Sequence, residues 1–536
     1  MKNIFKILSM LLFILSLSNA CTKGFDGLDS DPAQITDEQL SADFQDVGSL
    51  FQPIFESIII TSPAWKYQLQ QNLNADVFSG YMTNPRPFVS GHNNTTYNLV
   101  AGWNNFIWAI PYQNIMNNID KIEKKTEGQY PSFYGVAKIL KVEAMHRISD
   151  VYGPIVYKHY GESVTTAEYD TQAEDYDAFF TDLDTAVDLL DQNINDTKFA
   201  NFDLVYGGNL TSWIKFANSL RLRLAIRIAM ADPARAKTEA EKALSNPYGL
   251  IETNDEAFVI HGKKSHPLLT ICNAWDDIRM NASIESFMRG YHDPRISKYF
   301  SFVKEGDHST TPIDANNLKG IRGGLPLLSN YADEIAQKAA YVNFAVINKS
   351  VMTSDLQLMT AAEVWFLKAE AALRGWNGAG DAQTNYETGI STSFDQRGVG
   401  GASTYIADNT STPMNYVDPV NNSNSISALT SVTIAWDNAA SNEEKLEKII
   451  TQKWIAIYPQ GLEAWSEFRR TGYPKIFPVV SNQSGGTIDT NIQIRRIPFA
   501  VSEYDTNPDG VAGAVTKLGG PDNGGTRLWW DTGSNF

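Results

Sequence analysis

Cysteine is scarce in this chain of 536 residues, which contains only Cys21 and Cys272. Because Cys21 follows a signal-like N-terminal segment, we expect no disulfide inside the folded body. Stability therefore has to come from a hydrophobic core. Residues with apolar side chains make up 43% of the chain, an ordinary fraction for a globular protein and enough for a large core.

Positive charge is also in short supply. The chain has 44 Lys and Arg against 61 Asp and Glu, a formal net charge of −17 at pH 7. No run of basic residues with interleaved aromatics is present, so nucleic acid is not an expected partner. An acidic surface also fits polyanions poorly, which leaves neutral ligands as the expected class.

Motifs of covalent chemistry are missing as well. None of the seven histidines has H-E-x-x-H spacing, and the chain has no C-x-x-C, G-x-S-x-G, P-loop or G-x-G-x-x-G motif. The glycine cluster at 320–326 is better explained as a turn than as a phosphate loop, and 261–265 lacks the upstream glycine of a P-loop. We therefore predict a protein that is not an enzyme and needs no cofactor or metal. Acidic pairs are numerous, so a glycoside hydrolase stays open as an alternative.

Only one long apolar run is present, at 7–17, behind a basic start. It is too short to span a bilayer and predicts a signal peptide over 1–20. Cys21 then stands where a bacterial lipobox places its lipidated cysteine; the alternative is ordinary signal-peptidase cleavage, with Cys21 incidental. The short, polar and acidic segment 21–41 predicts a tether between the lipid and the body.

Helical periodicity dominates the rest, so we predict a mainly α fold. The helices are expected mainly in 42–245, 355–394 and 441–472. Ser62 is the expected N-cap of one of them, with Pro63 at its first helical position. Small residues alternate with large ones in the segment 356–376, as in tetratricopeptide-type helical pairs. The small positions are Ala362, Ala369 and Ala372, and the large ones Trp365, Phe366 and Leu373.

Two long stretches lack helical periodicity, 252–345 and 395–440. Both are rich in turn-forming and polar residues. Long irregular segments in a compact protein are frequently functional surfaces or disordered. We expect large loops and small β-elements, packed on the helical scaffold within a single domain spanning 42–536.

Aromatic residues carry the strongest functional signal, with 12 Trp, 23 Tyr and 26 Phe. Sugars stack their C–H faces on aromatic rings, and polar side chains bind their hydroxyl groups. Most of these aromatics belong in the core, and six tryptophans on predicted helices are expected to be structural: Trp103, Trp108, Trp213, Trp365, Trp454 and Trp465.

Trp275 is different, because it lies in an irregular segment among polar residues suited to a polyol. The predicted ligand-binding residues here are Asn273, Trp275 and Arg279, beside Asp276 and Asp277. The alternative is a loop aromatic that fills a gap in the scaffold.

The loop 79–98 is a second candidate. It offers Arg86, Phe88, Asn94 and Tyr97, close to Asp76. The alternative is that a loop between helices carries polar residues in any case.

The segment 461–474, GLEAWSEFRRTGYP, looks chemically rich, but helical geometry explains it. Leu462, Trp465 and Phe468 fall on roughly one face, expected to pack toward the preceding helix. Glu467 and Arg470 are three apart and can pair. Gly472 and the following proline then end the helix. We assign this segment to structure.

Eight segments in this order resemble the SusD/RagB family, the nutrient-binding outer-membrane lipoproteins of Bacteroidetes. The resemblance runs over essentially the whole chain, and the FRRTGYP and RRIPF signatures point to a SusD-like subgroup. The segments are YQLQQNLNADVFSGYM, DVYGPIVY, WIKFANSLRLRLAIRIA, DPR, TAAEVWFLKAEAALRGW, IITQKWIAIYPQGLEAWSEFRRTGYP, RRIPFAVSEYDTNP and LWWD.

The resemblance implies about four TPR-like helical pairs in a superhelix, with an irregular region packed on it. It implies a protein that is lipid-anchored to the outer membrane, faces the cell exterior and does no covalent chemistry. The expected partners are an oligosaccharide, held in a shallow aromatic-rimmed site built by loops, and a SusC-like TonB-dependent transporter. A peptide ligand, as in some members, is the alternative.

Overall fold

The computed structural model describes residues 41–86, 93–163, 166–262, 266–301, 317–326, 331–352 and 355–536. The chain divides into two units, Met1–Ser49 and Leu50–Phe536. In the first, the described residues contain the short helix α4 (Gln45–Gly48). Throughout the described ranges, no helix combines the length and the apolar character needed to cross a membrane.

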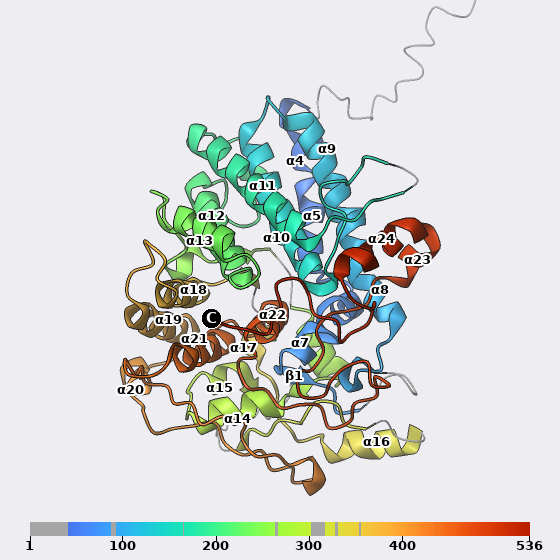
Figure 1. The fold of residues 1–536 in the computed structure, drawn as a ribbon, viewed down its shortest axis with the longest axis vertical. Coiled ribbons are helices and arrows are strands. Elements are labelled where there is room, and N and C mark those ends of the chain that lie inside the picture. Colours follow the sequence, from blue (N-terminus) through green and yellow to red (C-terminus); the bar gives the residue numbers. More distant parts are fainter. Residues whose placement is uncertain are drawn as a thin grey trace, which may run out of the picture. The chain divides into compact units, whose positions relative to one another are not determined.

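The second unit is built from consecutive helices that pack on one another. Helix α10 packs against α11, α11 against α12, and α12 against α13, and Figure 1 shows the four side by side. A bent arm of α8, the π-helix η3 and α9 packs against α5 and α10. The bounds are α5 Phe51–Ile58, α8 Ala101–Ile110, η3 Pro111–Met116, α9 Asn117–Thr126, α10 Pro131–Tyr152, α11 Gln172–Gln192, α12 Leu210–Arg227 and α13 Pro233–Leu244.

A second helical group follows later in the chain. Helix α18 (Ala361–Leu373) packs against α19 (Ala382–Arg397) and α21 (Asn442–Ala456), and α12 packs on α18 to join the two groups (Figure 1). The approach of α18 and α19 is close, because a Cβ added to Gly389 would lie 2.9 Å from the ring of Phe366. The predicted mainly α fold with packed helical pairs is confirmed.

Side-chain caps set where several helices begin. Thr171 and Glu174 form a capping box at α11, and Thr360 and Asp381 cap α18 and α19. The prediction for Ser62 is wrong. Helix α6 (Ala64–Tyr67) has Pro63, with extended backbone, at its N-cap and no side-chain cap, and it continues into the π-helix η1 (Gln68–Asn72).

Helix α22 (Gly461–Thr471) ends with the first four residues of the FRRTGYP signature and packs against α7 (Ala75–Phe78). Its first residue has no room for a side chain, since a Cβ on Gly461 would lie 2.3 Å from Oδ1 of Asp76. The predicted pair between Glu467 and Arg470 is present at 2.6 Å. Gly472 ends the helix in the left-handed region, with φ of 74°.

In the residues that the structure describes, three antiparallel two-stranded sheets join segments of the irregular region to one another and to neighbouring segments. They are β1 (Met82–Thr83) with β3 (Arg279–Met280), β2 (Phe258–Ile260) with β6 (Leu356–Met359), and β4 (Phe300–Ser301) with β5 (Val346–Ile347). Strand β6 replaces the helical start predicted at residue 356. The stretch 252–345 is also more regular than predicted, because it contains α14 (Ala282–Gly290), α15 (Ile296–Tyr299) and α16 (Tyr331–Ala340).

The stretch 395–440 is irregular as predicted, apart from α20 (Ala402–Ile406) and a short 3₁₀ turn, η8 (Asn422–Asn424). The remaining elements are short. They are η2 Asn94–Thr96, η4 Ala200–Phe202, η5 Asn254–Glu256, η6 Thr270–Ala274, α17 Lys349–Met352, α23 Val501–Thr506 and α24 Pro508–Leu518.

Buried ion pairs join the helices where the two groups meet. Arg223 of α12 pairs with Glu363 of α18 at 2.8 Å, and Arg227 pairs with Glu463 of α22 at 2.5 Å. Lys453 of α21 contacts Glu463 at 2.9 Å. All five side chains are at most 3% exposed. Removing one partner of such a pair leaves an uncompensated buried charge, so these contacts fix how the helices pack.

Candidate functional site

Trp275 lies directly after η6 and is half-buried. Helix α6 packs against η6, and two hydrogen bonds join residues that follow these two elements. The amide of Gln68 donates to Oδ2 of Asp277 at 3.2 Å, and the amide of Asn84 donates to the Asp277 carbonyl at 2.8 Å. The loop carrying Trp275 is therefore held by the chain around residues 64–84.

Helix α16 supports the same loop from another direction. Nζ of Lys338 donates to the Trp275 carbonyl at 3.2 Å and lies 3.6 Å from Oδ2 of Asp276. Arg279 pairs with Asp276 at 2.8 Å and is itself completely buried. Arg279 thus holds Asp276 from inside the protein and has no exposed surface for a ligand.

Arg86 is half-buried close to this loop. Burial raises the pKa of Asp277, while the hydrogen bond from Gln68 and the charges of Lys338 and Arg86 act in the opposite direction. Nε of Arg86 is buried and makes no hydrogen bond to the part of the chain that the structure describes. Arg86, Asn273 and Trp275 are the predicted residues that keep exposed surface in one neighbourhood.

A second aromatic stands on α6, which packs against η6. The side chain of Trp65 is 45% exposed, and its ring centroid lies 5.5 Å from that of the half-buried Phe106 on α8. Sequence reasoning missed this pair, because both rings fall in segments with helical periodicity. The remaining signal, a tryptophan two positions after a proline at a helix start, does not distinguish an exposed ring from a core ring.

Asp76 is completely buried between α7, η1 and α22. Its carboxylate accepts hydrogen bonds from Tyr67, Gln71 and Asn72 at 3.1 to 3.4 Å. Burial raises its pKa to about 7, although these hydrogen bonds lower it. Asp76 therefore belongs to the α7–α22 contact and is not within reach of a ligand here.

Asn94 and Tyr97 are buried as well. The amide of Asn94 donates to Oδ1 of Asn74 at 2.7 Å, and the hydroxyl of Tyr97 donates to Oε1 of Gln493 at 3.3 Å. Both side chains hold the loop against the scaffold. Phe88 and Cys21 lie outside the described residues.

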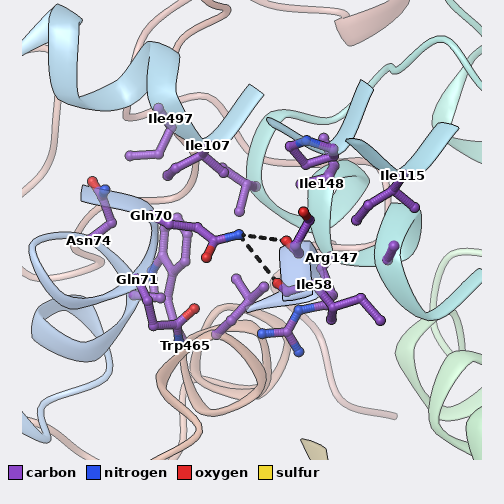
Figure 2. A pocket seen from close by; sticks show the side chains of 16 residues that line it. Ile58, Gln70, Gln71, Asn74, Ile107, Ile115, Arg147, Ile148, Trp465 and Ile497 are labelled. Carbon is purple, nitrogen blue, oxygen red and sulfur yellow. Dashed lines mark hydrogen bonds between the residues drawn. The ribbon is translucent and has the colours of Figure 1, made fainter. Parts of the chain in front are cut away.

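One internal cavity is lined by polar and apolar side chains of α5, η1, α8, α10 and α22 (Figure 2). The Gln70 amide bonds the carbonyls of Ser57 and Ile58 there, and Arg147 and Trp465 form further walls. Its volume is about 20 Å³, which is room for a water molecule and too small for a sugar.

The described residues contain neither a metal-binding cluster nor a reactive thiol. Among them, no three His, Cys, Asp or Glu side chains are grouped so that they could hold a metal ion. Cys272 is a free, fully buried thiol, and burial raises its pKa to about 12. A thiol of that pKa is a poor nucleophile at neutral pH.

Taken together, a scaffold of helical pairs carries half-exposed aromatic and polar side chains on short elements and loops, which is the make-up of a binding protein. The comparisons with known proteins agree. Residues 27–531 match the family model SusD-like, described as SusD and RagB outer membrane lipoprotein. The chain belongs to this family of non-catalytic outer-membrane binding lipoproteins. No curated protein matches the chain.

Solved structures that resemble it cover nearly the whole molecule. A chitin-binding SusD homologue from Flavobacterium johnsoniae is 49% identical, with a TM-score of 0.86 over 91% of this chain and 99% of that one. A SusD homologue from Bacteroides vulgatus is 42% identical, with a TM-score of 0.85 over 92% and 100%. A SusD-like protein from Bacteroides thetaiotaomicron is 33% identical, with a TM-score of 0.82 over 90% and 98%.

Proposed function

We propose that this protein captures oligosaccharides at the outer face of the outer membrane and passes them to a SusC-like TonB-dependent transporter. The observation that carries the proposal is the aromatic surface formed by Trp65 with Phe106 and by Trp275, on elements that pack together. The exposed Trp65 and the half-buried Trp275, which has the half-buried Arg86 and Asn273 in its neighbourhood, would provide the stacking and the hydrogen bonds that a sugar requires.

We further propose that the ligand is a glycan of N-acetylated amino sugars. Support comes from the 49% identical homologue that binds chitin. Arg86 and Asn273 would bind hydroxyl or acetamide groups beside Trp275. We expect affinity of order micromolar to millimolar, about −4 to −8 kcal/mol, because the ligand has to be released to the transporter. A peptide ligand of the RagB type is the remaining alternative.

Affinity electrophoresis in gels that contain soluble glycol-chitin tests this proposal against gels with a neutral glucan and gels with a protein hydrolysate. Retardation by glycol-chitin alone is the expected result, and retardation by the hydrolysate alone favours the peptide alternative. Detergent extraction of the native host membrane then tests the partner. Co-purification of an outer-membrane barrel supports transfer to a transporter, and isolation of the lipoprotein by itself contradicts it.

A further inference from the structure

A second cavity, remote in sequence from Trp65 and Trp275, has a different character. Its volume is about 380 Å³, within the range of small-molecule sites. It is formed by the C-terminal end of α22, the segment 475–495 and the last residues of the chain. In a protein with a net charge of −17, five cationic side chains and one acidic side chain line this cavity. The cations are Arg469, Arg470, Lys475, Arg495 and Arg527, and the acid is Glu443.

Three arginines of the cavity lining, Arg469, Arg495 and Arg527, carry more positive charge than the carboxylate they share neutralises. Asp531 alone serves two of them, Arg495 at 2.7 Å and Arg527. Arg469 has no carboxylate within ion-pair distance among the described residues, and its guanidinium donates to the carbonyls of Asp150 and Arg495. Burial lowers the pKa of Arg469, the charge of Asp150 raises it, and the charges of Arg495 and Arg227 lower it. The cavity is therefore electropositive.

Arg470 does not contribute to this excess. It pairs with Glu370 at 2.7 Å and with Glu467 at 2.6 Å, so two carboxylates neutralise its charge, and Glu370 also pairs with Arg374. The carboxylate of Glu443 accepts hydrogen bonds from the Tyr473 hydroxyl and the Asn535 amide, at 2.8 and 2.6 Å.

Lys475 and Arg527 place their charges at the cavity wall. Nζ of Lys475 lies 4.3 Å from the centre of the Tyr473 ring, and within the described ranges it forms no ion pair. Its charge opposes the burial that raises the pKa of Glu447. A glycine, which has no side chain, faces each of the two cations. A Cβ on Gly472 would lie 3.7 Å from Nζ of Lys475, and one on Gly533 would lie 3.5 Å from the guanidinium of Arg527. Both glycines line the cavity, so both charged groups border on it.

The rest of the lining is amphipathic. Leu429 and Ile492 are exposed at 46% and 40%, Phe468 lies deeper, and Asn491 supplies an exposed amide. The amide of Gln493 is buried and bonded to Tyr97 and to the carbonyl of Ile476, so it is not available to a ligand. We propose that this cavity binds a small molecule with one carboxylate, held by Lys475 and Arg527, whose hydroxyl or amide group meets the side-chain amide of Asn491. Sugar acids and acidic amino-acid residues both have this chemistry. The site is separate from the proposed glycan surface and does not depend on it.

Calorimetric titration of the intact protein with D-glucuronate, N-acetyl-L-glutamate and D-glucose tests this proposal. We expect one or both carboxylates to bind, D-glucose not to bind, and the affinity to fall as NaCl is raised from low to high concentration. Preference for D-glucuronate assigns an acidic sugar and preference for N-acetyl-L-glutamate an acidic peptide. Failure of both to bind, or equal binding of D-glucose, would overturn the proposal.

Variants locate the binding. Lys475→Gln with Arg527→Gln should weaken carboxylate binding at least tenfold, whereas Lys124→Gln with Lys237→Gln, two exposed lysines elsewhere, should leave it unchanged. Lys475→Gln alone is the variant that should fold normally, since this lysine makes no ion pair in the described structure. We expect it to lose several-fold in affinity for the carboxylate. Undiminished carboxylate binding in both Lys475→Gln and the double variant Lys475→Gln with Arg527→Gln would contradict the assignment. Trp65→Ala with Trp275→Ala should not alter carboxylate binding.

Discussion

The side-chain amide of Gln68 donates a 3.2 Å hydrogen bond to the carboxylate of Asp277, which lies 209 residues further along the chain. Both residues are 8% exposed. This bond joins the chain that carries Trp65 to the loop that carries Trp275. The position of Trp65 relative to Trp275 therefore depends on this contact between the two segments and not on either segment alone.

Gln68→Ala should therefore weaken glycan binding without removing any residue of the aromatic surface. A single buried hydrogen bond to a charged group contributes about 1.5–3 kcal/mol, and we expect part of that as a loss of affinity of about three- to tenfold. Calorimetry with a chito-oligosaccharide measures it. The matched control is Gln52→Ala, because Gln52 makes an exposed bond of the same length to Glu56. Equal affinity of Gln68→Ala and wild type would show that this bond does not position the surface.

The buried pair between Arg470 and Glu370, 2.7 Å apart, should dominate local stability. Arg470→Met leaves Glu370 and Glu467 with one cation fewer, and we expect a loss of about 3–5 kcal/mol in the free energy of unfolding. Lys124→Met is the control. It breaks an exposed pair with Asp120 of the same 2.7 Å length and should cost less than about 1 kcal/mol. Urea titration gives both values, and similar losses in the two variants would contradict this account.

Much of the scaffold follows from sequence alone, for a physical reason. Helices such as α10 to α13 have periodic apolar faces, and caps such as Thr171 define where they begin. Ser62 failed as a predicted cap because the chain is extended through Pro63, and the helix starts after it. Helices α14 and α16 were missed because polar, glycine-rich neighbours interrupt their short apolar pattern.

The candidate site was predictable only in part. Trp275 is conspicuous because its neighbours are polar in an irregular segment. Asp76, Asn94 and Arg279 have the same composition cues, but they are buried and bond to other protein side chains, Asp76 to Asn72, Asn94 to Asn74 and Arg279 to Asp276. Trp65 is the reverse case: its segment has helical periodicity, and its exposure depends on which helices pack beside α6.

Asp76 should make stability depend on pH with a sign opposite to that of a paired carboxylate. Burial raises its folded-state pKa to about 7, while the pKa of Asp in an unfolded chain is about 3.9. Between these values the folded protein holds a proton that the unfolded chain releases, so this group's contribution to stability is largest below about pH 4 and falls as pH rises to about 7.

Asp76→Asn removes that titration. Its stability relative to wild type should rise by on the order of 2–4 kcal/mol between about pH 4 and pH 7.5. Urea titrations of both proteins at several pH values measure the difference, in which other ionisable groups largely cancel. Asp177→Asn, a change at an exposed carboxylate, is the control and should show little dependence. A difference for Asp76→Asn that stays constant with pH would contradict the raised pKa.

The proposal that Trp65 and Trp275 together form a glycan-binding surface is tested most directly by calorimetric titration of chitohexaose into wild type, Trp65→Ala, Trp275→Ala and the double variant. Burial of one ring face against a sugar is worth about 1–2 kcal/mol, so each single change should weaken binding by about 5- to 30-fold and the double change more. Trp436→Ala, at a half-buried tryptophan that packs on Tyr386, is the control and should bind like wild type. Wild-type affinity in the double variant would contradict the account.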